Sequence, residues 1–99
     1  MKTSELLGEA RDELYKGWTQ GEYANHIGHV CAIGAIERVA LRHQDIVAAA
    51  KAQQEVNRLA KEIYGCSMVQ SFNDRYNTGK QDVLDLFDKA IIGLEERGE

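Results

Sequence analysis

The stretch Cys31-Ala32-Ile33-Gly34-Ala35-Ile36 decides the fold, because the clearest helical pattern in the chain begins there. Ile33, Ile36 and Val39 recur at the three- and four-residue spacing of one helix face. The small residues between them allow a neighbouring backbone to approach closely. Glycine inside a helix costs about 1 kcal/mol relative to alanine. We therefore expect Gly34 to have a packing reason and this helix to be central to the core.

Three further segments have apolar residues at helical spacing, each between a capping residue and a closing glycine. Each cap offers a side-chain oxygen to the free N–H groups of a first helical turn. The sequence predicts a capping box at Thr78 and Gln81 for the last of these helices. The predicted pairs of cap and closing glycine are Thr3 or Ser4 with Gly17, Asp45 with Gly65, and Thr78 with Gly98.

Two stretches lack helical periodicity. Residues 22–30 contain the turn sequence Asn25-His26-Ile27-Gly28-His29, and we expect a short strand or irregular hairpin there. Residues 65–81 are the longest irregular stretch, in which residues 68–72 are expected to form an extended segment. The predicted fold is mainly α: a compact four-helix domain over residues 1–99, with a short two-stranded or irregular segment.

The composition excludes several classes of function. The chain has 99 residues and a net charge of −4, spread evenly over its two halves, which argues against a nucleic-acid partner. No apolar run approaches the roughly 18 residues needed to span a bilayer. The first residues include acids where a signal peptide needs an apolar stretch. We therefore expect a cytoplasmic protein without a membrane partner, in which Cys31 and Cys66 are reduced thiols.

Three blocks of sequence together resemble a known family. They are Gly17-Trp18-Thr19-Gln20-Gly21, then Cys31 to Ile36, then Phe72-Asn73-Asp74 followed by Thr78 and Val83-Leu84-Asp85-Leu86-Phe87. In order and spacing they are similar to the DUF6197 family, small uncharacterised proteins from actinobacteria and their phages. That family has a G-W-x-Q-G turn, a C-A-x-G-A-L helix start and a W-N-D loop before a capped terminal helix. The resemblance runs from Leu6 to Ala90.

The resemblance implies a phage or actinobacterial source and an accessory role, but no particular activity. Thr19 stands where the family often has cysteine, Phe72 replaces the tryptophan of W-N-D, and residues 23–29 have no clear counterpart. The positions that the resemblance singles out are Trp18, Gln20, Cys31, Asn73 and Asp74.

His26, His29 and Cys31 could be metal ligands, with Asp74 or Cys66 as a fourth. Zinc sites usually have two paired ligand clusters, whereas this chain has one loose cluster without a recognised spacing. We therefore expect surface histidines and a buried cysteine, and neither a metal nor another cofactor.

Cys31 could also be a nucleophile, because a helix N-terminus lowers the pKa of a thiol and His29 is near in sequence. Asp74 or Asn73 could orient that histidine as a third member. Against this, Cys31 begins an apolar run that suits a core cysteine. Packing is the interpretation that we favour, and Cys31, His29 and Asp74 stay as the alternative catalytic set.

Trp18, Gln20, Asn73 and Asp74 are the candidate ligand-binding residues, because polar side chains from two loops could line a pocket beside the helix start. The structural interpretation is the one that we favour. Trp18 would pack between the first and last helices, Gln20 would satisfy buried backbone groups, and Asn73 and Asp74 would bond their own loop.

The helices that meet at His43-Gln44 suggest a helix-turn-helix, but residues 45–54 include one lysine and many alanines, too few donors for phosphates and bases. The alanine-rich stretch 48–52 could instead pack against a copy of itself, which leaves homo-oligomers open. We expect a small accessory protein that binds another protein, such as a host protein, rather than a catalyst. The alternative is a small enzyme or ligand-binding protein with its site at Cys31, His29, Asn73 and Asp74.

Overall fold

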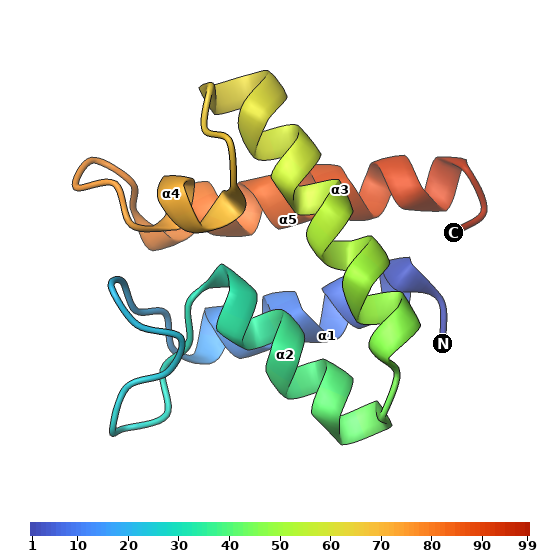
Figure 1. Cartoon of the computed structure of the whole chain (residues 1–99), viewed down its shortest axis with the longest axis horizontal. Helices are drawn as coiled ribbons and strands as arrows, with labels where there is room; N and C mark the ends of the chain where they lie inside the picture. Colours follow the sequence, from blue (N-terminus) through green and yellow to red (C-terminus); the bar gives the residue numbers. More distant parts are fainter.

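The computed structural model describes residues 1–99, and it is mainly helical as predicted (Figure 1). It has five helices rather than four. They are α1 (Thr3–Lys16), α2 (Ala32–His43), α3 (Ile46–Tyr64), α4 (Val69–Asn73) and α5 (Lys80–Glu96).

The additional helix is α4, where the sequence predicted an extended segment. Its start is fixed by α3, because the side-chain oxygen of Asn57 accepts the backbone N–H of Val69 at 2.7 Å. Its end is fixed by an aromatic contact, in which the rings of Tyr64 and Phe72 stack with centroids 4.1 Å apart. These contacts between distant residues stabilise a helix of five residues, too short to form alone.

Helix α1 packs against α2, α3 and α5, and α3 crosses in front of α5 in the view of Figure 1. The two chain ends lie near each other, since the backbone N–H of Ser4 donates to the carbonyl of Glu99 at 3.3 Å. One core of 24 buried apolar residues joins all five helices. None of the helices is both long and apolar enough to cross a membrane.

Helix α2 buries in the core the face that the sequence predicted. Ile33, Ile36 and Val39 are buried, and the packing reason for Gly34 is confirmed. A Cβ atom at Gly34 would lie 2.0 Å from the backbone carbonyl oxygen of Tyr23. The loop before α2 therefore lies directly against the first turn of the helix, at a distance that only glycine permits.

The ends of α3 agree with prediction. The carboxylate of Asp45 accepts the backbone N–H of Ala48 at 3.0 Å, and Gly65 follows the helix at φ +69°. A positive φ at the residue after a helix is a conformation that glycine adopts without steric cost.

The predicted start of α1 is wrong in detail. Thr3 and Ser4 are buried residues inside the helix and do not cap it. The carboxylate of Glu5 accepts the backbone N–H of Lys2 at 2.9 Å instead. A carboxylate suits this position because it is a strong acceptor at the positive end of the helix.

The predicted capping box of α5 is displaced by one residue, for the same reason. Gly79 precedes the helix, and the carboxylate of Asp82 accepts its backbone N–H at 2.8 Å. Thr78 is buried, and Gln81 donates to Asp85 within the helix.

The loop from Gly17 to Cys31 is irregular and has two isolated bridges rather than a strand. Val30 pairs with both Trp18 and Ala24. The side-chain oxygen of Asn25 accepts the backbone N–H groups of Ile27 and His29, which closes the turn between the bridges.

Candidate functional site

The three sequence blocks meet at Asn73, which is fully buried at the end of α4. Its amide oxygen accepts the indole N–H of Trp18 at 2.9 Å and the backbone N–H of Ala32 at 3.0 Å. Its amide nitrogen donates to the carbonyl of Thr19 at 3.1 Å and to the carboxylate of Asp74 at 2.9 Å. One side chain therefore joins the first loop, the start of α2 and α4.

Gln20 makes the second set of contacts between the loops. Its amide nitrogen lies 3.0 Å from the carbonyl oxygen of Asn73, 2.8 Å from that of Arg75 and 3.3 Å from that of Thr78. The expectation that Gln20 satisfies backbone groups is confirmed. It fixes the turn that leads from α4 to α5.

Asp74 completes this group, which we call the Asn73 cluster (Trp18, Gln20, Asn73 and Asp74). Its carboxylate accepts the backbone N–H of Gly21 at 3.0 Å and the side-chain amide of Gln70 at 2.9 Å. Desolvation raises the pKa of Asp74, but these bonds and the one from Asn73 outweigh it and hold the pKa below its ordinary value. The carboxylate is therefore ionised at neutral pH.

Cys31 is fully buried and caps α2 with its sulfur atom. Its Sγ accepts the backbone N–H of Gly34 at 3.3 Å and donates to the side-chain oxygen of Gln70 at 3.4 Å. Burial is the largest influence on the pKa of the Cys31 thiol and raises it above its ordinary value, although the backbone N–H groups of the first turn lower it. The thiol is therefore protonated at neutral pH, whereas a nucleophilic cysteine needs its thiolate.

His29 lies against a different part of the loop. A Cβ atom at Gly17 would be 2.1 Å from the His29 ring, so the ring covers that glycine. No hydrogen bond joins His29 to Cys31 or to Asp74, although Gln70 bonds to both Cys31 and Asp74. Nowhere in the chain do three or more His, Cys, Asp or Glu side chains form a group that could hold a metal ion.

The Asn73 cluster brings all four candidate ligand-binding residues together, but they bond to one another and to the backbone. No buried side-chain nitrogen or oxygen in the chain lacks a partner. None of the four surface hollows is lined by a residue of the cluster. The cluster therefore holds the loop after α1 and the loop after α4 against α2 and α4.

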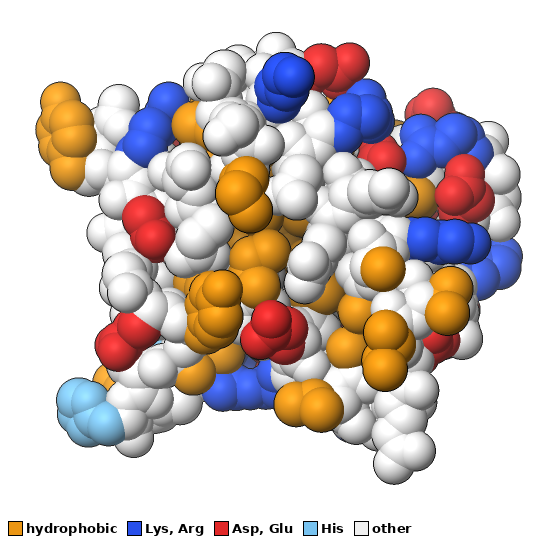
Figure 2. All heavy atoms as spheres, in the orientation of Figure 1, with side chains coloured by type: hydrophobic (Ala, Val, Ile, Leu, Met, Phe, Trp, Pro, Cys, Tyr) orange, Lys and Arg blue, Asp and Glu red, His pale blue; other side chains and the backbone are white.

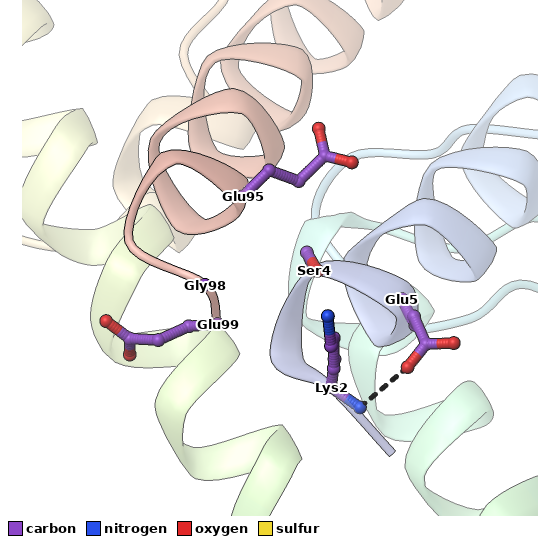
Figure 3. A pocket seen from close by; sticks show the side chains of 6 residues that line it. All are labelled: Lys2, Ser4, Glu5, Glu95, Gly98 and Glu99. Carbon is purple, nitrogen blue, oxygen red and sulfur yellow. Dashed lines mark hydrogen bonds between the residues drawn. The ribbon is translucent and has the colours of Figure 1, made fainter.

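One surface hollow lies between the start of α1 and the end of α5, with a volume of about 390 Å³ (Figure 3). Glu5 and Glu95 project from the two helices, and Lys2 lies beside Glu5 in the same view. No apolar side chain lines this hollow, so it lacks the wall on which most ligand sites rely.

A second surface, on the outside of α2, is apolar and was not predicted. Leu41 is 80% exposed and Ile46, one residue into α3, is 81% exposed. Figure 2 shows hydrophobic side chains on the face of the molecule that carries α2 and the start of α3. The signal in the sequence was Leu41 itself, because it lies off the face formed by Ile33, Ile36 and Val39.

Two hollows border this surface, and both are lined by Glu37 and Leu41. These residues are four apart on α2 and form a ridge along the helix. The larger hollow, about 510 Å³, is also lined by Ala40, Gln44, Ile46 and Ala49. The smaller, about 330 Å³, is also lined by Tyr23, Ala24, Val30, Gly34 and Arg38. We call the ridge and its two hollows the α2 surface.

The sequence model of one family matches residues 1–92 of the chain, and that family is described as "Family of unknown function (DUF6197)". No curated protein and no solved structure matches the chain.

Proposed function

We propose that this chain, which belongs to the DUF6197 family, works by binding another protein through its α2 surface rather than by catalysis. The observation that supports the proposal is the exposure of Leu41 and Ile46 beside two hollows with apolar walls. Single exposed apolar residues are common on soluble proteins. A contiguous apolar surface with adjoining hollows is typical of a protein interface.

The energetics of the exposed side chains favour an interface. Covering a Leu or Ile side chain that is exposed to water stabilises a complex by about 1.5–3 kcal/mol. Leu41 and Ile46 are the two most exposed aliphatic side chains in the chain, and both line the larger hollow. They are therefore the residues that we expect to contribute most to binding.

The Asn73 cluster has a supporting role in this proposal. It bonds to the first loop at Thr19 and Gly21 and to the start of α2 at Ala32, and this loop and α2 together form the smaller hollow. A rigid surface loses less conformational entropy when it binds, so the cluster raises affinity without contacting the partner.

The proposed setting follows from the family resemblance. We propose an accessory protein of an actinobacterium or of a phage that infects one, acting in the cytoplasm on a protein of the cell. Small size and an internally satisfied polar cluster support a binding role over an enzymatic one.

The test is affinity capture from a lysate of the natural host with three forms of the protein. Wild type is compared with Leu41→Ser and with Ile92→Ser, in which an apolar residue of α5 that is 56% exposed is changed in the same way. We expect one protein captured by wild type and by Ile92→Ser but lost with Leu41→Ser. Equal capture by all three forms would contradict the proposal.

A further inference from the structure

We infer that the partner presents an amphipathic helix with a lysine or arginine beside its apolar stripe, and that this cation pairs with Glu37. The inference rests on the proposed function, because it names the chemistry of the segment that the α2 surface binds. It follows from the charges around the ridge and from the shape of the two hollows.

Glu37 is the only acidic side chain that lines either hollow. It is exposed and forms no ion pair within the chain. It is also bordered on the ridge by Leu41, which is exposed and apolar. A carboxylate next to an apolar surface favours a partner in which a cation also lies next to apolar side chains. Those side chains cover the apolar surface and exclude water, which strengthens the ion pair.

The two arginines of α2 pair with carboxylates of α1, and Arg38 does so although it also lines the smaller hollow. Arg38 donates to the carboxylate of Glu13 at 3.3 Å. Arg42 contacts Glu9 at 3.1 Å and Glu13 at 3.3 Å. Each arginine of α2 therefore has a carboxylate partner on α1, whereas Glu37 has no cationic partner in the chain and is the charged group of the α2 surface that is left for a basic partner.

The shape of the surface favours a helix over an extended strand. The lining residues of α2 run from Gly34 to Leu41, which is about 10 Å of helix and just over two turns. A ridge of residues four apart with a hollow on each side is the complement of the ridges and grooves of a second helix. The nearby loop has only isolated bridges, both made by Val30, so it offers no strand edge for an added strand.

A second copy of this chain is a poorer occupant. A symmetric contact across the ridge would place two copies of Glu37 in one interface. Each copy also has a net charge of −4, which opposes close approach.

The experiment uses two synthetic helical peptides of roughly 15 residues, about four turns. Both have the same leucine stripe, flanked by lysines in one and by glutamates in the other. Each is titrated into the ¹⁵N-labelled full chain, and a lysine peptide without the leucine stripe controls for non-specific attraction. We expect only the peptide with both leucines and lysines to shift the amide signals of Glu37, Leu41 and Ile46.

The role of Glu37 is tested separately with Glu37→Gln. We expect this change to weaken binding of the leucine-lysine peptide by roughly two- to fivefold, which is the size of one ion pair at a surface. The matched control is Glu96→Gln, because Glu96 is also exposed and unpaired but lies at the end of α5. This control should leave the affinity unchanged.

The outcomes separate this inference from the proposed function. The inference of a basic partner is overturned if the two leucine peptides bind at Leu41 with equal affinity and Glu37→Gln leaves that affinity unchanged. This result would not overturn the proposal that the α2 surface binds a protein. If the peptide shifts amide signals only outside the α2 surface, or shifts none, the inference of a helical partner is overturned. The affinity capture with Leu41→Ser then still tests whether the α2 surface binds a protein. Dimerisation of the free chain that Leu41→Ser abolishes would show that a second copy is the occupant, and would also overturn the inference.

Discussion

The amide oxygen of Asn73 accepts the backbone N–H of Ala32 at 3.0 Å, which joins the end of α4 to the first turn of α2 across 41 positions of sequence. The same oxygen accepts the indole N–H of Trp18. The three blocks that identify the family are thus in contact through one buried side chain. The stability of the fold should therefore depend on this side chain.

Replacing Asn73 with alanine should destabilise the fold strongly. The change leaves the indole of Trp18 and the backbone N–H of Ala32 without their acceptor, and each unsatisfied buried group costs about 1–3 kcal/mol. We expect a loss of about 3 kcal/mol or more in the free energy of unfolding, measured by urea denaturation. Asn77→Ala, an exposed asparagine in the next loop, is the control and should be nearly neutral.

Gly34→Ala should also destabilise the protein, although alanine is the better helix former. The added Cβ would meet the carbonyl oxygen of Tyr23, a backbone atom that cannot move away without displacing the loop. Gly8→Ala is the matched control, because Gly8 lies within α1 and a Cβ there has no neighbour within 4 Å. We expect Gly8→Ala to stabilise by roughly 0.5–1 kcal/mol and Gly34→Ala to lower the melting temperature.

Cys31 should react slowly with a thiol reagent in the native protein. It is fully buried, and burial raises the pKa of its thiol, whereas Cys66 is partly exposed. Mass spectrometry during iodoacetamide treatment should therefore show Cys66 modified first and Cys31 modified only on unfolding. Rapid labelling of Cys31 near neutral pH would instead favour the enzymatic alternative.

Acid should destabilise the protein through Glu13. Desolvation raises the pKa of this nearly buried carboxylate, but bonds from Arg38 and Lys16 outweigh it, and the pKa lies below the ordinary value of 4.5 for a glutamate. A group with a lowered pKa stabilises the fold above its unfolded pKa, and this contribution is lost as the pH falls through the folded value.

We therefore expect the free energy of unfolding to decrease as the pH falls below about 4.5, measured by denaturation at several pH values. Glu13→Gln should make that dependence shallower, because its amide does not titrate. Glu96→Gln should not alter the slope in the same way, since Glu96 is exposed and has no ion partner. An unchanged slope for Glu13→Gln would contradict the assignment.

Much of the helical core could be predicted from periodicity. The buried face of Ile33, Ile36 and Val39 follows from spacing alone, and Gly34 could be singled out because glycine is costly inside a helix. Helix α4 could not be predicted, since its five residues depend on the bond from Asn57 and the ring of Tyr64. Local pattern holds no information on such contacts between distant residues.

The candidate site could also be predicted only in part. Family resemblance selected Trp18, Gln20, Asn73 and Asp74, and the structure brings them together. Their partners could not be derived, because the bonds from Gln20 to Asn73 and from Asn73 to Thr19 each cross more than 50 positions of sequence. The α2 surface was not predicted, because it is defined by apolar residues that lie outside the core and not by polar groups with recognisable chemistry.

The central claim is the proposal that the α2 surface binds a protein, and photo-crosslinking in cells that produce this chain tests it most directly. A photoreactive amino acid is placed at position 41 in one form of the protein and at position 92 in another, both of which are exposed. We expect one dominant crosslinked protein from position 41 that is absent from position 92. No crosslink at position 41, or the same products from both positions, would contradict it.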